Sequence, residues 1–193
     1  MRPAFTLVAV LSTAVLFAGM APGGEEPELQ FKERAAVAAI VELSYRLDAP
    51  DVSDRAKLIV REHESESISS IFSPTKRGGF GAGKLLGDNP NPSIQQLVMR
   101  WRSRPPTKEH LEANRADALQ VARVIRAMSE LAPHRKPRNP NPSNVKQWSE
   151  VAVEFKAAAI DFHQAVKGDE PETVKLAAKR LHVTCCHCHT LVE

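Results

Sequence analysis

The sequence predicts an all-α protein built as a helical bundle. Nothing after residue 24 shows sustained alternation of apolar and polar residues, which is the pattern of a half-buried strand. Several stretches instead repeat apolar residues at spacings of three and four, and proline or glycine separates these stretches. The chain of 193 residues suits a leader followed by one domain with a sizeable core.

Residues 1–24 have the layout of a secretory signal peptide. Arg2 supplies a positive charge, Ala4–Met20 is apolar and uncharged, and small residues follow as far as Gly24. An uncleaved anchor is the alternative, but the apolar stretch is shorter than the roughly 20 residues that span a bilayer comfortably. We therefore expect a cleaved leader, export to the periplasm and no stable membrane span in the mature protein.

Six segments after the leader are predicted to be helical. Two lie in residues 25–91, which we interpret as an N-terminal helical extension with a glycine- and proline-rich loop. Residues 92–193 are interpreted as a helical bundle that ends in a cofactor-attachment motif. The six segments are Pro27–Leu47, Val52–Phe72, Ser93–Arg102, Lys108–Ala132, Asn144–Lys167 and Pro171–Leu191.

The last three segments have the clearest boundaries. Thr107 is the expected N-cap of the fourth segment, and Pro133 ends that segment. Ser143 is the expected N-cap of the fifth, and Gly168 is expected to close it. Pro171 stands in the first turn of the sixth. Because the fifth and sixth are joined by so short a turn, they must lie antiparallel and adjacent.

The pentapeptide NPNPS occurs at Asn89–Ser93 and again at Asn139–Ser143, each time before a helical pattern. Proline holds the residue before it in an extended conformation, and serine caps helices. The flanking sequences differ, so the repeat predicts one loop-and-cap arrangement used twice and not a duplicated domain.

Charge singles out no macromolecular partner. The formal net charge is +3, and basic and acidic residues are mixed along the chain without a basic block interleaved with aromatics. Nucleic acid is therefore not indicated as a partner.

The strongest functional signal is the C-terminal stretch TCCHCHTLVE, which holds all 3 cysteines of the chain. Cys185, Cys188 and His189 spell C-x-x-C-H, the attachment sequence of c-type haem. On a helix these three positions share one face, because they are spaced by three and four. Two thiols there can form thioethers to the vinyl groups of one porphyrin, and the imidazole can bind iron as the proximal axial ligand. We therefore predict one covalently attached haem c per chain.

Two other interpretations of this cluster stay open. A zinc site can be assembled on one helical face from His182, Cys185, Cys188 and His189. Structural zinc sites, however, usually draw their ligand pairs from two separate segments. A disulfide of the thioredoxin kind would need a βαβ context that this chain lacks. Cys186 lies outside the C-x-x-C-H pattern, and as a free thiol it would be able to link two copies into a homodimer.

A leader, a helical bundle and a last helix that carries C-x-x-C-H close to the C-terminus resemble the class II cytochromes c, the cytochrome c′ family. The resemblance is best from Lys108 onward. It implies a four-helix bundle of cytochrome c′ type, here with extra N-terminal helices, that holds haem inside. It also implies a non-enzymatic protein of the periplasm that exchanges electrons with redox partner proteins or binds a small gas.

The first helix of such a bundle supplies the residue on the other side of the iron. If Ser93–Arg102 is that helix, Met99 is the expected distal ligand of a six-coordinate electron carrier. If it is Val52–Phe72, the distal position falls near Val60 without a methionine, and the iron would be open to NO or CO. Electron transfer is the function we expect, with gas binding or sensing as the alternative. A zinc-stabilised helical module is a more remote one.

Overall fold

A computed structural model describes residues 26–192 of the chain, so the expected leader at residues 1–24 lies outside the described residues. From residue 26 to residue 192 the backbone forms helices, turns and loops without a strand, which confirms the all-α prediction. None of the helices in this range is long and apolar enough to cross a membrane.

The helices follow one another along the chain with short 3-10 turns between some of them. They are α1 (Glu26–Ser44), α2 (Val52–Glu62), α3 (Ser65–Ser69), η1 (Ser70–Phe72), η2 (Thr75–Arg77), η3 (Gly83–Leu86), α4 (Ile94–Trp101), α5 (Lys108–Ala113), α6 (Arg115–Leu131), η4 (Ala132–His134), α7 (Pro142–Gly168) and α8 (Pro171–Val192).

Two of the predicted helices are each divided in the structure. The segment Val52–Phe72 breaks after Glu62, because His63 is extended (φ −122°, ψ 142°) and separates α2 from α3. The segment Lys108–Ala132 breaks at Asn114, whose amide Nδ2 donates to the His110 carbonyl at 3.0 Å. This side chain satisfies a carbonyl at the end of α5, so the helix ends there and α6 begins as a new one.

The two NPNPS copies begin their helices at different residues. In the first copy Ser93 is the N-cap of α4, and Gln96 completes a capping box with it. In the second copy Asn141 is the N-cap of α7, so the prediction of Ser143 was wrong. Residue 146, three positions after Ser143, is a lysine that cannot complete a capping box, whereas Pro142 is preorganised for the first helical position. Thr107 caps α5 as predicted, by accepting from His110 N at 3.2 Å.

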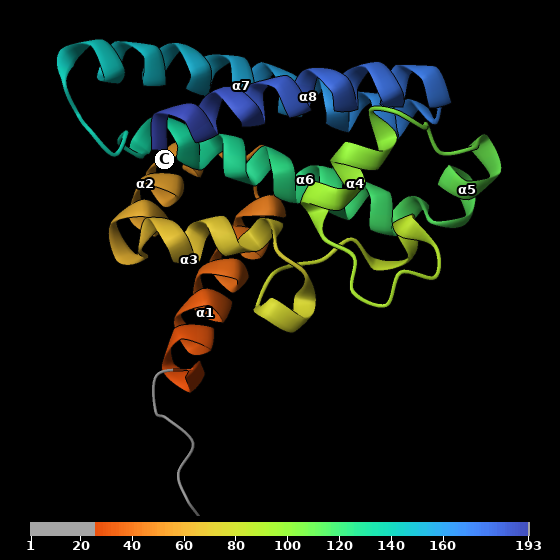
Figure 1. Cartoon of the computed structure of the whole chain (residues 1–193), viewed down its shortest axis with the longest axis horizontal. Helices are drawn as coiled ribbons and strands as arrows, with labels where there is room; N and C mark the ends of the chain where they lie inside the picture. The colour runs from red at the N-terminus through yellow and green to blue at the C-terminus, as the bar shows by residue number, and fades with distance from the viewer. Residues whose placement is uncertain (1–25, 193) are drawn as a thin grey trace, which may run out of the picture.

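The long helices lie side by side. α7 and α8 run together along one side of the molecule, α6 packs against α7, and α1 and α2 pack against α6 from the opposite side (Figure 1). Gly168 is the last residue of α7, and Asp169 takes the left-handed conformation (φ 60°) that closes it. Since the next helix starts at Pro171, α7 and α8 are antiparallel neighbours as predicted.

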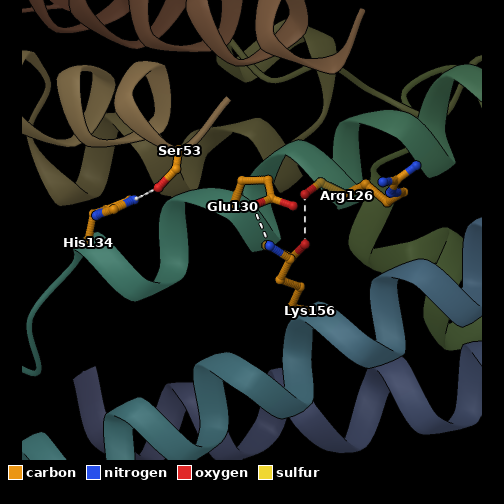
Figure 2. A network of polar contacts seen from close by, with 6 residues as sticks. Ser53, Arg126, Glu130, His134 and Lys156 are labelled. Atoms are coloured by element: carbon orange, nitrogen blue, oxygen red, sulfur yellow. Dashed lines mark hydrogen bonds and ion pairs between the residues drawn. The ribbon is translucent and has the colours of Figure 1, made fainter. Parts of the chain in front are cut away.

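Polar contacts fix the packing around the end of α6. Lys156 of α7 donates to Glu130 of α6 at 2.7 Å, and Ser53 of α2 lies 3.2 Å from the ring of His134 (Figure 2). Trp148 of α7 also donates through its indole nitrogen to the Ala132 carbonyl at 3.0 Å. These contacts join three helices around η4, next to the site described below.

Residues 26–91 belong to the same hydrophobic core as the rest of the described chain. Ile40, Ile68 and Ile71 are fully buried in one cluster with Ile125 and Phe162. The N-terminal segment, interpreted from the sequence as an extension, is therefore packed into the bundle and contributes to its interior.

Candidate haem-attachment site

The C-x-x-C-H motif lies in the last turns of α8. Cys185, Cys188 and His189 are helical, and all three line one cavity of about 450 Å³. Sequence reasoning had expected them to share one face, because positions spaced by three and four lie together on a helix. This volume is within the range of about 300–1,000 Å³ that is usual for small-molecule and cofactor sites.

The walls of this cavity are mostly apolar and come from α3, α4, α6, α7 and α8, together with residues of η1 and η4. α4 and α6 supply aliphatic and methionine side chains, and α7 supplies two aromatic ones. The main apolar residues are Phe72, Ile94, Val98, Met128, Trp148 and Phe155. The pairing of α4 with α8, which lie in close contact, brings Ile94 and Val98 near the motif. A porphyrin requires such an apolar surround with a few polar groups that fix its orientation.

The motif cysteines are free thiols in a desolvated environment. Burial raises the pKa of Cys185 to about 12, with further increases from Cys188 and Cys186. Burial also raises the pKa of Cys188 to about 11, although Arg135 opposes this change. Both thiols are therefore protonated at neutral pH, and protonated buried thiols react slowly with oxidants and alkylating reagents.

Arg135, just after η4, is a cation in the wall of this cavity. Its Nη2 donates to the Ser65 carbonyl at 3.4 Å and to Ser69 Oγ at 3.3 Å, both on α3. Its Nε is buried without a hydrogen-bond partner among the described residues. Burial lowers the pKa of the Arg135 guanidinium, and the neighbouring Cys188 opposes that effect. Among the described residues this guanidinium is held by neutral oxygens, and a desolvated cation of this kind is suited to an anion that enters the cavity.

Met99, the expected distal ligand, does not line this cavity. Its side chain is 45% exposed on α4, whereas Met128 on α6 is 3% exposed and does line the cavity. Val60, considered for the alternative distal position, is half-buried on α2 and also lies outside the lining, as does His63 at the end of that helix. Of the two methionines in residues 26–192, Met128 is thus the one placed to reach a group beside the motif.

The residues between and before the motif positions differ in their surroundings. His187 is exposed, and its Nδ1 lies 3.9 Å from a Glu154 carboxylate oxygen. Cys186 is exposed but reaches the edge of the cavity, where its Sγ lies 3.7 Å from Nε2 of His182. Burial, and then the charge of Arg102, lower the pKa of His182, which therefore stays neutral near pH 7. His182, a member of the zinc site considered from the sequence, is half-buried at the cavity.

The zinc ligands considered from the sequence do not form a preassembled site among the described residues. Within residues 26–192, no three His, Cys, Asp or Glu side chains lie close enough together to hold a metal ion. His182, Cys185, Cys188 and His189 all line the cavity, but they do not converge on one point.

Arg135 and Met128 were not identified from the sequence as residues of the site. Met128 belongs to the apolar stripe of its helix, and only the contacts of that helix show that it also borders the cavity. Comparisons with family models, with curated proteins and with solved structures give no match to this chain.

Proposed function

We propose that this protein is an exported c-type haem protein of the periplasm that carries single electrons between redox partner proteins. The observation that supports it best is that Cys185, Cys188 and His189 line one apolar cavity together with the cation Arg135, whose Nε has no hydrogen-bond partner among the described residues. We also propose that the helices around this cavity form a bundle of the cytochrome c′ type. α6, α7, α8 and the short α4 would be its four members, with α1–α3 as additions.

The donor set of the cavity fits a haem c. The thiols of Cys185 and Cys188 would each add their S–H across one vinyl double bond, a step that consumes no oxidant. His189 would bind the iron, and Arg135 would pair with a propionate carboxylate. Bound haem would supply reversible one-electron exchange at iron, with a potential set by the axial ligands and by burial. The aromatic and aliphatic walls, Trp148 and Phe155 among them, would exclude water from it.

The position of Arg135 is consistent with this assignment. Haem propionates are carboxylates, and Arg135 is a cation in the same cavity as the motif, close enough to Cys188 to affect the pKa of that thiol. The guanidinium of Arg135 is held by Ser65 and Ser69 of α3. α3 packs against α1 and η1, on the side of α6 away from α7 and α8 (Figure 1).

The sixth position decides between electron transfer and the alternative, gas binding. Met128 lines the cavity and carries a thioether, which favours a six-coordinate electron carrier. The apolar wall made by Phe72, Ile94 and Val98 offers no ligand, and this favours an open site for NO or CO if Met128 does not bind. We take Met128 as the distal ligand in place of Met99.

The test is production of the full chain in a host able to attach haem, followed by mass spectrometry and visible spectroscopy. We expect one covalent haem per chain, loss of the attachment when Cys185 and Cys188 are replaced by serine, and cleavage of the leader near Gly24. A reduced protein whose spectrum is unchanged by carbon monoxide would support the electron carrier, and a changed spectrum the gas-binding alternative. Colourless protein with its motif thiols open to alkylation after unfolding would contradict the proposal.

A further inference from the structure

A second hollow of the molecule, of about 400 Å³, is strongly basic. It lies between the residues that follow α1, the first part of α6 and the last turns of α7, and it shares no lining residue with the motif cavity. Its charged and titratable lining residues are Tyr45, Asp48, Arg115, Arg123, Arg126, His163 and Lys167. Four permanent cations therefore face one carboxylate. This is unusual in a chain whose overall charge is only +3.

Neighbouring acids neutralise this hollow only in part. Arg115 forms an ion pair with Asp169 and donates to the Lys167 carbonyl at 3.1 Å. Glu130, one turn after Arg126 on α6, forms its ion pair with Lys156 instead, with 2.7 Å between Nζ and Oε2. The guanidinium of Arg126 points away from Glu130 (Figure 2). Arg123 and Arg126 are thus left without an ion pair to an acid among the described residues, and like charges held together repel one another.

Two buried polar atoms on residues that line this hollow have no hydrogen-bond partner among the described residues. They are Nε of Arg126 and Nδ1 of His163, and they come from two different helices, α6 and α7. Buried polar groups are nearly always satisfied, and an unsatisfied one destabilises the fold by about 1–3 kcal/mol. A ligand that accepts hydrogen bonds would satisfy Nε of Arg126, and it would also satisfy Nδ1 of His163 when that nitrogen carries the imidazole proton.

The pKa of His163 also reflects the positive charge of this hollow. Burial lowers the pKa of His163, and Arg126, Arg123 and Lys167 lower it further, whereas Asp48 acts in the opposite direction. The imidazole is therefore neutral near pH 7, where one of its nitrogens donates a hydrogen bond. A dianion bound among these groups would raise the pKa of His163 again.

We propose that this basic hollow binds a phosphate group, either as inorganic phosphate or as the phosphate of a small ester. Planar guanidinium groups recognise the oxygens of phosphate through pairs of parallel hydrogen bonds. Several cations around one carboxylate suit a dianion better than a singly charged carboxylate, because a dianion offsets more of their mutual repulsion. The proposal is independent of haem attachment, since the two sites have no residue in common.

The test is calorimetric titration of the purified full-length protein with sodium phosphate and, separately, with glycerol phosphate, at ionic strength held constant with sodium chloride. We expect saturable binding of one ligand per chain and a rise in the His163 pKa when binding is complete, followed by NMR. Tighter binding of the ester by tenfold or more would identify an ester as the ligand, and equal or tighter binding of inorganic phosphate would identify free phosphate.

Arg126→Gln and Arg123→Gln are each expected to weaken phosphate binding at least tenfold. Arg123 is exposed, so its replacement tests the site even if Arg126→Gln does not fold. Arg104→Gln, which removes an exposed arginine outside the hollow, is the matched control and should bind as the parent does. Phosphate that has no effect beyond that of equal ionic strength, or binding unchanged by both substitutions in the hollow, would overturn the proposal.

Discussion

Replacing Arg135 by methionine should affect the haem-loaded protein and the haem-free protein differently. Methionine keeps an unbranched apolar side chain in the wall of the cavity but removes the charge and the donors of the guanidinium. If the guanidinium pairs with a propionate, its removal matters only when the propionate is present. The sign and size of the change in unfolding free energy therefore test the role assigned to this residue.

The magnitude follows from the contacts of Arg135. Its hydrogen bonds to Ser65 and Ser69 are long, 3.4 and 3.3 Å, and each should contribute no more than about 0.5 kcal/mol. Their loss is offset by about 1 kcal/mol, because the buried Nε no longer lacks a partner. In the haem-free protein these effects nearly cancel. In the loaded protein a charge-assisted hydrogen bond worth about 1.5–3 kcal/mol is also lost, so we expect a net destabilisation of about 2 kcal/mol.

The assay is denaturant unfolding of the parent and Arg135→Met, each produced with and without haem attachment. Lys136→Met removes one positive charge from an exposed neighbour and serves as the control, with little change in either form. A second readout is the reduction potential, which should fall in Arg135→Met because a cation near the iron disfavours its oxidised state. Equal changes in stability with and without haem, together with an unchanged potential, would refute the pairing.

Three further substitutions test the site, the core and the pH dependence. Met128→Leu conserves side-chain volume and should destabilise the protein by less than about 1.5 kcal/mol, yet carbon monoxide should now change the spectrum of the reduced protein. In the control Met99→Leu, carbon monoxide should leave the reduced spectrum unchanged. If carbon monoxide also leaves the reduced spectrum of Met128→Leu unchanged, Met128 is excluded as a ligand. Phe162→Ala, at 0% exposure, should lower the unfolding free energy by about 3–5 kcal/mol, whereas Val153→Ala, at 68% exposure, should change it by less than about 0.5 kcal/mol. Because the folded pKa of His163 lies below its usual value of 6.5, the unfolded chain binds the proton more readily, and stability should decrease as the pH falls below 6.5. This decrease in stability should be smaller in His163→Gln. The prediction is contradicted if the unfolding free energies of the two proteins change in parallel with pH.

The sequence predicted the helices well where a single apolar stripe continues. The predicted segment Asn144–Lys167 covers most of α7, where Trp148, Phe155 and Phe162 are buried, and the short turn before Pro171 predicted its antiparallel partner α8. The sequence-based prediction failed where a side chain ends a helix without interrupting the spacing of the apolar residues. Asn114 is such a residue, because its amide competes locally for a backbone carbonyl while apolar residues continue on both sides.

The motif residues could be predicted from local spacing alone, but the walls of the cavity could not. C-x-x-C-H fixes the relative positions of its three side chains on one helix, whatever packs against that helix. Phe72 comes to the cavity from the N-terminal segment, and Ser65 and Ser69 of the same segment hold the guanidinium of Arg135, so this wall depends on contacts between distant parts of the chain. Met128 lines this cavity and Met99 does not, a difference that the local sequence pattern did not indicate.

α6 contributes to both proposed sites, because two different faces of this one helix line them. Ile125 and Met128 border the motif cavity, and Arg123 and Arg126 border the basic hollow. Each pair is three residues apart and shares a face, while the two pairs point to different sides. Since neither pair borders both sites, Met128→Leu should leave phosphate binding intact, and Arg126→Gln should leave the haem ligands intact. A substitution that abolished both readouts would instead have unfolded α6, which a loss of its cooperative unfolding transition would reveal.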